Sequence, residues 1–218
     1  MPNGRSTTTT LRIALLSDIK IPENLRPTDG RFGCGPSRIR PAALQALADS
    51  GNSILGTSHR QKPVKQVVRR VREGLSALFE LPQGYEVVLG NGGSTAFWDI
   101  ATFGLIESGS QHLVFGEFSS KFAAAAKEAP FLGEPSVIKA EPGSHPQAHA
   151  QDGIDLYALP HNETSTGVSM PILRPAGTEG SLVVVDATSA AGGLSVDAKE
   201  FDTYYFAPQK SFASDGGL

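Results

Sequence analysis

The sequence is poor in cysteine and has no long apolar run. Cys34 is the only cysteine among 218 residues, so no disulfide can form within one chain, which fits a reducing compartment. We interpret Cys34 as a small buried or loop residue, because nothing near it supplies the histidine that a nucleophilic cysteine needs. No stretch approaches the roughly 18 apolar residues of a membrane span, and residues 11–19 are too interrupted by polar side chains for a signal peptide. These absences lead us to expect a cytoplasmic protein.

An excess of charge is also missing. Charged residues make up 19% of the chain, and the net charge is −3 with an isoelectric point near 5.9. This balance gives no reason to expect a nucleic-acid surface, and we expect no metal site. Hydrophobic residues reach 39%, which is enough for a packed core and excludes a disordered tail.

The chain divides into a short arm and one domain. Residues 1–30 carry a threonine run, Pro22, Pro27 and an Asp29-Gly30 turn signal, and are expected to be an irregular arm. Residues 31–218 are expected to form the domain. Within it, residues 141–153 are rich in Pro, Gly, His and Gln, which predicts a surface loop.

Helix and strand patterns alternate along the domain. A helix is predicted to begin at Pro63 with one apolar face, and its basic opposite face is interpreted as solvated rather than as a ligand site. Further helices are predicted over residues 95–106 and 119–128, and strands over residues 86–89, 113–115, 154–159, 182–185 and 203–206. This alternation predicts an α/β fold: a three-layer α/β/α domain whose sheet is mainly parallel, with ligands bound at the carboxyl ends of its strands.

Three features could bind or transform a ligand. The first is the glycine-rich turn Gly90-Asn91-Gly92-Gly93-Ser94-Thr95 between a predicted strand and a helix, where free backbone N–H groups and hydroxyls can hold a phosphate. It is neither a Walker loop nor a dinucleotide fingerprint. The alternative is a tight turn that binds nothing.

The second and third features are Asp186 and Lys210. Asp186 directly follows a buried strand and is either a carboxylate in the crevice or a helix N-cap. Lys210 follows another strand among apolar residues, where partial desolvation favours Schiff-base chemistry. The alternative is an exposed lysine on a turn. Pyridoxal 5'-phosphate (PLP) needs a phosphate cradle, an acid for its ring nitrogen and a lysine for its aldehyde, and the chain supplies them in that order.

Six short sequence motifs, in the right order, resemble those of phosphoserine aminotransferases, most closely the actinobacterial ones. The resemblance runs from about Ile21 to the last residue. The six motifs are Phe32-Gly33-Cys34-Gly35-Pro36-Ser37, Gly56-Thr57-Ser58-His59-Arg60, Gly90-Asn91-Gly92-Gly93, His161-Asn162-Glu163-Thr164-Ser165-Thr166-Gly167, Asp186-Ala187-Thr188-Ser189 and Ala207-Pro208-Gln209-Lys210-Ser211-Phe212. The resemblance implies a class-V, fold-type I PLP-dependent aminotransferase.

The resemblance also implies roles for single residues. Lys210 would be the Schiff-base lysine and proton shuttle, and Asp186 would keep the pyridine nitrogen protonated. The other implied contacts are Ser94, Thr95 and Gln209 to the cofactor phosphate, Phe118 stacked on the ring, Thr164 to the ring's phenolic oxygen, and Arg60 with His59 to the substrate anion. Phe118 could instead be a core residue beside Phe115 and Phe122, and His161 is ranked below the others because a lone histidine is more often structural.

The implied reaction is transamination between L-glutamate and 3-phosphohydroxypyruvate, which gives O-phospho-L-serine and 2-oxoglutarate in serine biosynthesis. The family works as a homodimer with shared active sites. Family members continue well past the position of Leu218, and some carry an arginine where this chain has Thr95. We therefore expect the 218-residue chain alone to be poorly active, and leave two alternatives open: another fold-type I PLP enzyme, or a non-catalytic remnant.

Overall fold

The computed structural model describes residues 20–31 and 33–218. The chain separates into two compact units, Met1–Gly33 and Cys34–Leu218. The described residues of the first unit contain one short 3₁₀ helix, η1 (Glu23–Leu25). Most of the expected arm over residues 1–30, and Phe32 of the first family motif, lie outside the described residues.

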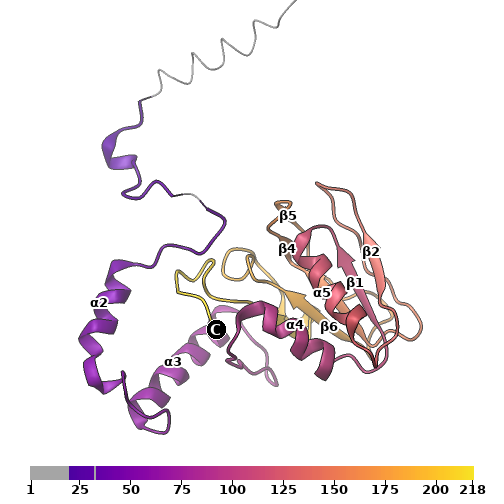
Figure 1. Cartoon of the computed structure of the whole chain (residues 1–218), viewed down its shortest axis with the longest axis horizontal. Helices are drawn as coiled ribbons and strands as arrows, with labels where there is room; N and C mark the ends of the chain where they lie inside the picture. Colours follow the sequence, from indigo (N-terminus) through magenta and orange to yellow (C-terminus); the bar gives the residue numbers. More distant parts are fainter. Residues whose placement is uncertain (1–19, 32) are drawn as a thin grey trace, which may run out of the picture. The chain divides into compact units, whose positions relative to one another are not determined.

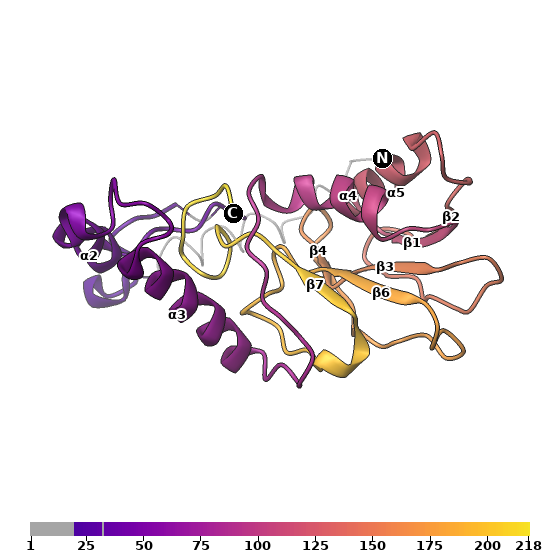
Figure 2. The ribbon, with the colours of Figure 1, turned by 90° about the horizontal axis from the view of Figure 1, so that it is seen from below.

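The second unit is organised around a five-stranded parallel sheet (Figure 1). Its strand order is β2-β1-β3-β6-β7 (Figure 2). Its strands are β1 (Ser110–Val114), β2 (Ser136–Lys139), β3 (Leu156–Pro160), β6 (Leu182–Asp186) and β7 (Thr203–Tyr205). A small antiparallel hairpin pairs β4 (Asn162–Glu163) with β5 (Val168–Ser169). The central strands β1 and β3 are buried along their whole length, as expected for strands covered on both faces.

Helices precede or connect these strands. They are α2 (Pro41–Ser50), α3 (Lys62–Leu78), α4 (Gly93–Gly104) and α5 (Glu117–Glu128), with short 3₁₀ helices η2 (Gly51–Ser53) and η3 (Ala198–Glu200). Both α2 and α3 carry a proline in the first turn, where the missing N–H costs no hydrogen bond.

Alternate side chains of each strand enter different layers of the core. Leu156, Val184 and Tyr205 face α4 and α5, where they pack with Trp98 and Phe122. The residues that alternate with them face the other layer, which contains Met170, Ile172, Phe201 and the partly buried Phe79 and Leu81 just after α3. In Figure 2, α4 and α5 lie side by side over one face of the sheet. The mainly parallel α/β fold expected from the sequence is therefore confirmed.

One predicted strand is wrong. Residues 86–89 have the side-chain alternation of a strand, since Tyr85, Val87 and Leu89 are half-buried while Glu86 and Val88 are exposed. Nevertheless no described segment pairs with them. Alternation records which side chains are covered, but a strand also needs a hydrogen-bonded neighbour.

The first two helices of the domain leave their apolar side chains uncovered. Neither α2 nor α3 has a buried residue. The predicted apolar stripe of α3 is present, but Val67, Val68, Val71 and Leu78 are 36 to 56% exposed. Leu44 and Leu47 of α2 are exposed as well. Among the described residues, no helix has both the length and the apolar character needed to cross a membrane.

Candidate active site

The carboxyl ends of four parallel strands carry most of the predicted site residues. Phe118 follows β1, Thr164 follows β3, Asp186 ends β6, and Lys210 follows β7. In a parallel sheet these ends share one edge, and such an edge is where α/β proteins bind ligands. The topology thus brings residues that are up to 92 positions apart, as 210 minus 118, to one end of the domain.

Asp186 is the centre of a hydrogen-bonded cluster. Its Oδ1 accepts from the backbone N of Thr188 at 3.0 Å and from Thr188 Oγ1 at 2.6 Å. Its Oδ2 accepts from Tyr205 Oη at 3.0 Å and is 3.4 Å from Trp98 Nε1, which also donates to Tyr205 Oη at 3.0 Å. The sequence left open whether Asp186 is an N-cap or a crevice carboxylate. The Thr188 N–H bond is cap-like, and the carboxylate also reaches the layer under α4.

The carboxyl group of Asp186 lacks a cationic partner. Burial raises its pKa above the ordinary aspartate value, although hydrogen bonds from Thr188, Tyr205 and Trp98 act in the opposite direction. None of the ion pairs formed by the described residues involves Asp186. A buried carboxylate without a counter-charge is costly, so this position is suited to a ligand that brings a positive charge.

The N-terminus of α4 is open. Gly92 precedes it with φ of 100°, a conformation that a residue with a Cβ rarely adopts. No side chain caps this end of the helix. Ser94 Oγ lies 2.7 Å from Thr188 Oγ1. The Thr188 hydroxyl therefore lies within hydrogen-bond distance of both Ser94 Oγ and Asp186 Oδ1. The glycine turn is therefore joined to the Asp186 cluster. The Gly92 N–H donates to the Gly217 carbonyl at 3.1 Å, and the N–H groups at the start of α4 itself can bind an anion.

A second hydroxyl chain adjoins the first. Ser189 Oγ donates to Asn162 Oδ1 at 2.8 Å, so Thr164 Oγ1, 2.5 Å from Ser189 Oγ, donates to that serine. Since Ser189 directly follows Thr188, the two chains link the ends of β3 and β6. The structure thereby brings Thr164, Ser94 and Asp186 into a network of two hydrogen-bonded chains that adjoin through the backbone of Thr188 and Ser189.

Lys210 lies in the same unit with a different hydrogen-bond partner. Its Nζ donates to the backbone carbonyl of Cys34 at 2.8 Å, and no hydrogen bond joins it to Asp186 in the described part of the chain. Gly35 has a φ of 141°, which favours glycine, and a Cβ there would come within 2.7 Å of Nζ. The neighbouring Gln209 has a buried, unpartnered Oε1.

Phe118 is not a core residue. It is 42% exposed, whereas Phe115 and Phe122 are buried at 3 and 4%. The Lys121 ammonium lies 5.7 Å from the Phe118 ring centroid. An exposed ring at a strand end is available for stacking, and the core alternative for Phe118 is excluded.

The structure does not bring every predicted residue into the network. Thr95, His59 and Arg60 are exposed, and none of them has a hydrogen bond to the Asp186 cluster among the described residues. His161 is buried at 3%, and its Nδ1 lies 3.1 Å from Tyr204 Oη. Burial lowers the pKa of His161, which agrees with a neutral structural histidine.

Several members of the network were not predicted as site residues. Trp98, Thr188, Tyr205 and Ser189 surround Asp186 and Thr164, and Glu163 is a buried carboxylate beside them. Thr188, Ser189 and Glu163 belong to motifs that carry the family resemblance. Trp98 and Tyr205 had only a positional signal, since they lie one turn into α4 and at the end of β7.

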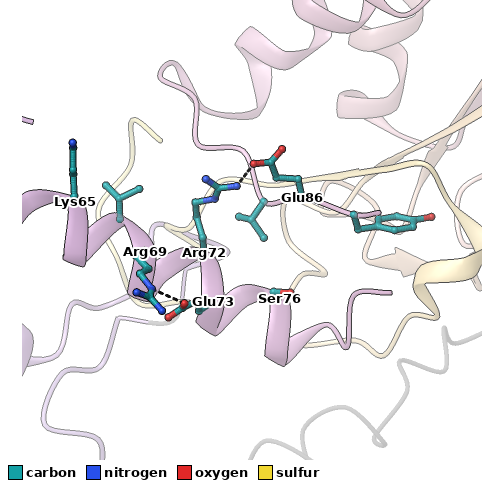
Figure 3. A pocket seen from close by; sticks show the side chains of 9 residues that line it. Lys65, Arg69, Arg72, Glu73, Ser76 and Glu86 are labelled. Carbon is teal, nitrogen blue, oxygen red and sulfur yellow. Dashed lines mark hydrogen bonds and ion pairs between the residues drawn. The ribbon is translucent and has the colours of Figure 1, made fainter. Parts of the chain in front are cut away.

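A groove in the domain lies away from these residues. A groove of about 390 Å³ runs between α3 and residues 85–87, lined by basic and acidic side chains (Figure 3). Arg69 pairs with Glu73, and Arg72 pairs with Glu86. These two pairs neutralise part of the charge on the face of α3 that was predicted to be solvated. In the described residues, no group of three or more potential metal-binding side chains occurs.

The fold and the site define a class of protein. The family profile of class-V aminotransferases matches residues 32–217, and the chain belongs to this family.

The curated relatives of this chain include phosphoserine aminotransferases. That of Nocardioides sp. is 66% identical over 202 residues, which cover 92% of this chain and 54% of the relative. The structure of the enzyme from Cytophaga hutchinsonii matches with a TM-score of 0.76 and 29% identity, over 84% of this chain and 52% of that one. The PLP-bound enzyme of Trichomonas vaginalis shares the fold, with a TM-score of 0.68 and 19% identity over 85% of this chain and 55% of that one. The chain spans about half the length of the curated relatives it matches.

Proposed function

We propose that this chain is the PLP-binding part of a phosphoserine aminotransferase, which transfers an amino group between L-glutamate and 3-phosphohydroxypyruvate. The half-buried carboxylate of Asp186, which has no cationic partner among the described residues, carries the assignment of the cofactor. The 66% identity to the Nocardioides enzyme supports the assignment of the substrates. The same proposal includes a cytoplasmic location, which a single free cysteine favours.

The residues present fit PLP. A protonated pyridine nitrogen would give Asp186 the cation it lacks, and a phosphate would accept from the free N–H groups at the start of α4 and from Ser94. Gln209 would donate from its amide nitrogen to the same phosphate. Phe118 offers an exposed ring face, and Thr164 offers a hydroxyl at the ring edge.

Bound PLP supplies an electron sink that stabilises charge at the α-carbon of an amino acid. The chain's own residues would prepare and use this sink. Asp186 would keep the ring nitrogen protonated. Burial disfavours an unpaired carboxylate, so a positively charged ring nitrogen beside Asp186 would be stabilised by the ion pair. Lys210 Nζ would leave the Cys34 carbonyl and carry the proton to and from the α-carbon. Arg60 and His59 remain proposed contacts to the substrate anion.

The partner of the active protein is proposed to be a second copy of the chain. The exposed apolar side chains of α2 and α3 support this, because a stripe of valines and leucines on uncovered helices is suited to an apolar interface. The exposed positions of Arg60 and His59, between these helices, are compatible with a site shared across such an interface.

Two measurements test the proposal. PLP added to the purified chain should give an absorbance band in the region typical of a lysine-bound cofactor, and Lys210→Ala should abolish this band. Lys199→Ala is a matched control on η3 that should leave it unchanged. A band that survives Lys210→Ala would refute the role of Lys210.

The substrates need a longer protein. A chimera that continues this chain with the remaining half of the Nocardioides relative should convert glutamate and 3-phosphohydroxypyruvate. Preference for glyoxylate as amino acceptor, or release of sulfur from cysteine, would favour another fold-type I enzyme. A chimera that binds PLP without any turnover would favour a non-catalytic remnant.

A further inference from the structure

Glu163 is a buried carboxylate for which the proposed chemistry has no use. It is 1% exposed and lies between Asn162 and Thr164, which belong to the hydroxyl network. Its own side chain points to another element, the N-terminus of α5. This is the helix that carries Phe118.

The first turn of α5 is held by three hydrogen bonds from the β4–β5 hairpin. The backbone N of Glu117 donates to Ser165 Oγ at 2.9 Å. The backbone N of Phe118 donates to Glu163 Oε1 at 3.3 Å, and that of Ser119 donates to Glu163 Oε2 at 2.9 Å. These N–H groups have no partner within a helix, so the hairpin supplies acceptors for all three.

Side-chain bonds tighten the same contact. Ser119 Oγ donates to Glu163 Oε2 at 2.8 Å, and Ser165 Oγ donates to Glu163 Oε1 at 2.9 Å. Gly116, which precedes α5, approaches so closely that an added Cβ would lie 2.0 Å from Glu163 Cγ. The contact therefore requires a glycine on one side and an ionised carboxylate on the other.

The charge of Glu163 is stabilised in place. Burial alone would raise its pKa, but the hydrogen bonds from Ser119, Ser165 and Phe118 outweigh it, and the pKa is lowered below the ordinary glutamate value. A carboxylate at a helix N-terminus also gains from the helix dipole. By contrast, the N-terminus of α4 has no capping side chain and remains available for an anion.

We propose that Glu163 is a positioning residue that fixes the Phe118 ring relative to Thr164, so that both contact the same cofactor ring. This inference rests on the proposed function. Glu163 holds the backbone of Phe118 directly, and it is the residue immediately before Thr164. One carboxylate thus joins the residue proposed to stack on the ring face to the residue proposed to bind the ring edge.

The test compares three variants of the chain. Glu163→Gln removes the charge and places an amide N–H group against the backbone N–H donors of Phe118 and Ser119. Ser165→Ala is a milder change at an exposed position that removes the bond to Glu117. Asp155→Asn is the matched control, because Asp155 likewise accepts from the backbone N of Glu107, Ser108 and Gly109, but at the opposite edge of the sheet.

Two readouts are needed. The first is hydrogen exchange of the Phe118 and Ser119 amides in protein without cofactor. The second is the dissociation constant for PLP, with the circular dichroism of the bound cofactor band. If the first turn is docked in only a tenth of the Glu163→Gln molecules, the dissociation constant should rise about tenfold, and protection of the two amides should fall with it. Ser165→Ala should have a smaller effect in the same direction, and Asp155→Asn should change neither readout.

Unchanged amide protection in Glu163→Gln would overturn the proposal, and so would an equal loss of PLP affinity in Asp155→Asn. If the unaltered chain does not bind PLP, the proposed function and the ring-positioning role both fail. In that case hydrogen exchange still decides whether Glu163 fixes the turn.

Discussion

Replacement of Tyr205 by phenylalanine is the most direct test of the hydrogen-bonded cluster around Asp186. The change removes one oxygen atom, which accepts from Trp98 Nε1 and donates to Asp186 Oδ2, both at 3.0 Å. The ring can stay where it is, because its stacking on Phe97 at a centroid distance of 4.2 Å does not involve the hydroxyl.

The expected loss follows from the partners left behind. Trp98 is 7% exposed, so its N–H cannot be satisfied by water and retains only the 3.4 Å contact to Asp186. An unsatisfied buried polar group costs about 1–3 kcal/mol, and we expect the free energy of unfolding to fall by about that amount. For a domain of this size the midpoint of thermal unfolding should drop by about 2–12 °C.

The assay is urea unfolding followed by far-ultraviolet circular dichroism and by tryptophan emission. Trp98 is the only tryptophan of the chain, so its emission reports on this cluster alone and should change in the folded variant. Tyr157→Phe is the control: Tyr157 is also buried and accepts one hydrogen bond, from the backbone N of Gln151, in the layer on the other side of the sheet. A Tyr205→Phe variant as stable as the parent, with unchanged emission, would refute the reasoning.

Three further predictions follow from other parts of the domain. Burial lowers the pKa of His112 to about 4, so its contribution to stability is complete above pH 6.5 and is lost as the pH falls through about 4. The difference between the ordinary pKa and the lowered one corresponds to roughly 3 kcal/mol of the free energy of unfolding. His112→Gln should remove this pH dependence from urea midpoints measured between pH 6.5 and 4.5. Val71→Asp on the apolar stripe of α3 should weaken self-association in sedimentation, whereas Arg70→Asp on the same helix should not. Asp186→Asn should raise the dissociation constant for PLP by at least tenfold in an absorbance titration, since an amide cannot pair with a protonated ring nitrogen.

The sequence predicts which long segments form the sheet better than it predicts which segments pair with one another. Residues 182–185 and 203–206 were recognised as strands because their burial is decided by local composition, and β6 and β7 begin where expected. Residues 86–89 had an equally good pattern, but pairing depends on a neighbour that local pattern cannot reveal. The hairpin of β4 and β5 was missed because two-residue strands leave almost no periodic signal.

For the site, the order of the candidate residues along the chain indicated where they lie, but the sequence did not indicate which side chains contact them. The order of the cradle, Asp186 and Lys210 indicated one edge of a sheet, and the topology brings them there. The partners of Asp186 could not be inferred, because Trp98 and Tyr205 lie 88 and 19 positions away. Their contact depends on how α4 packs over β6 and β7, which is a property of the assembled core.

The bond between Lys210 and the main chain at Cys34 has a practical consequence. Cys34 is the only cysteine of the chain and its thiol is exposed, while its carbonyl oxygen accepts from Lys210 Nζ. A maleimide dye would therefore attach only at Cys34, the residue whose carbonyl accepts the hydrogen bond from the Lys210 amine. The emission of the dye would change when Lys210 Nζ leaves the Cys34 carbonyl, and no cysteine has to be introduced for this measurement.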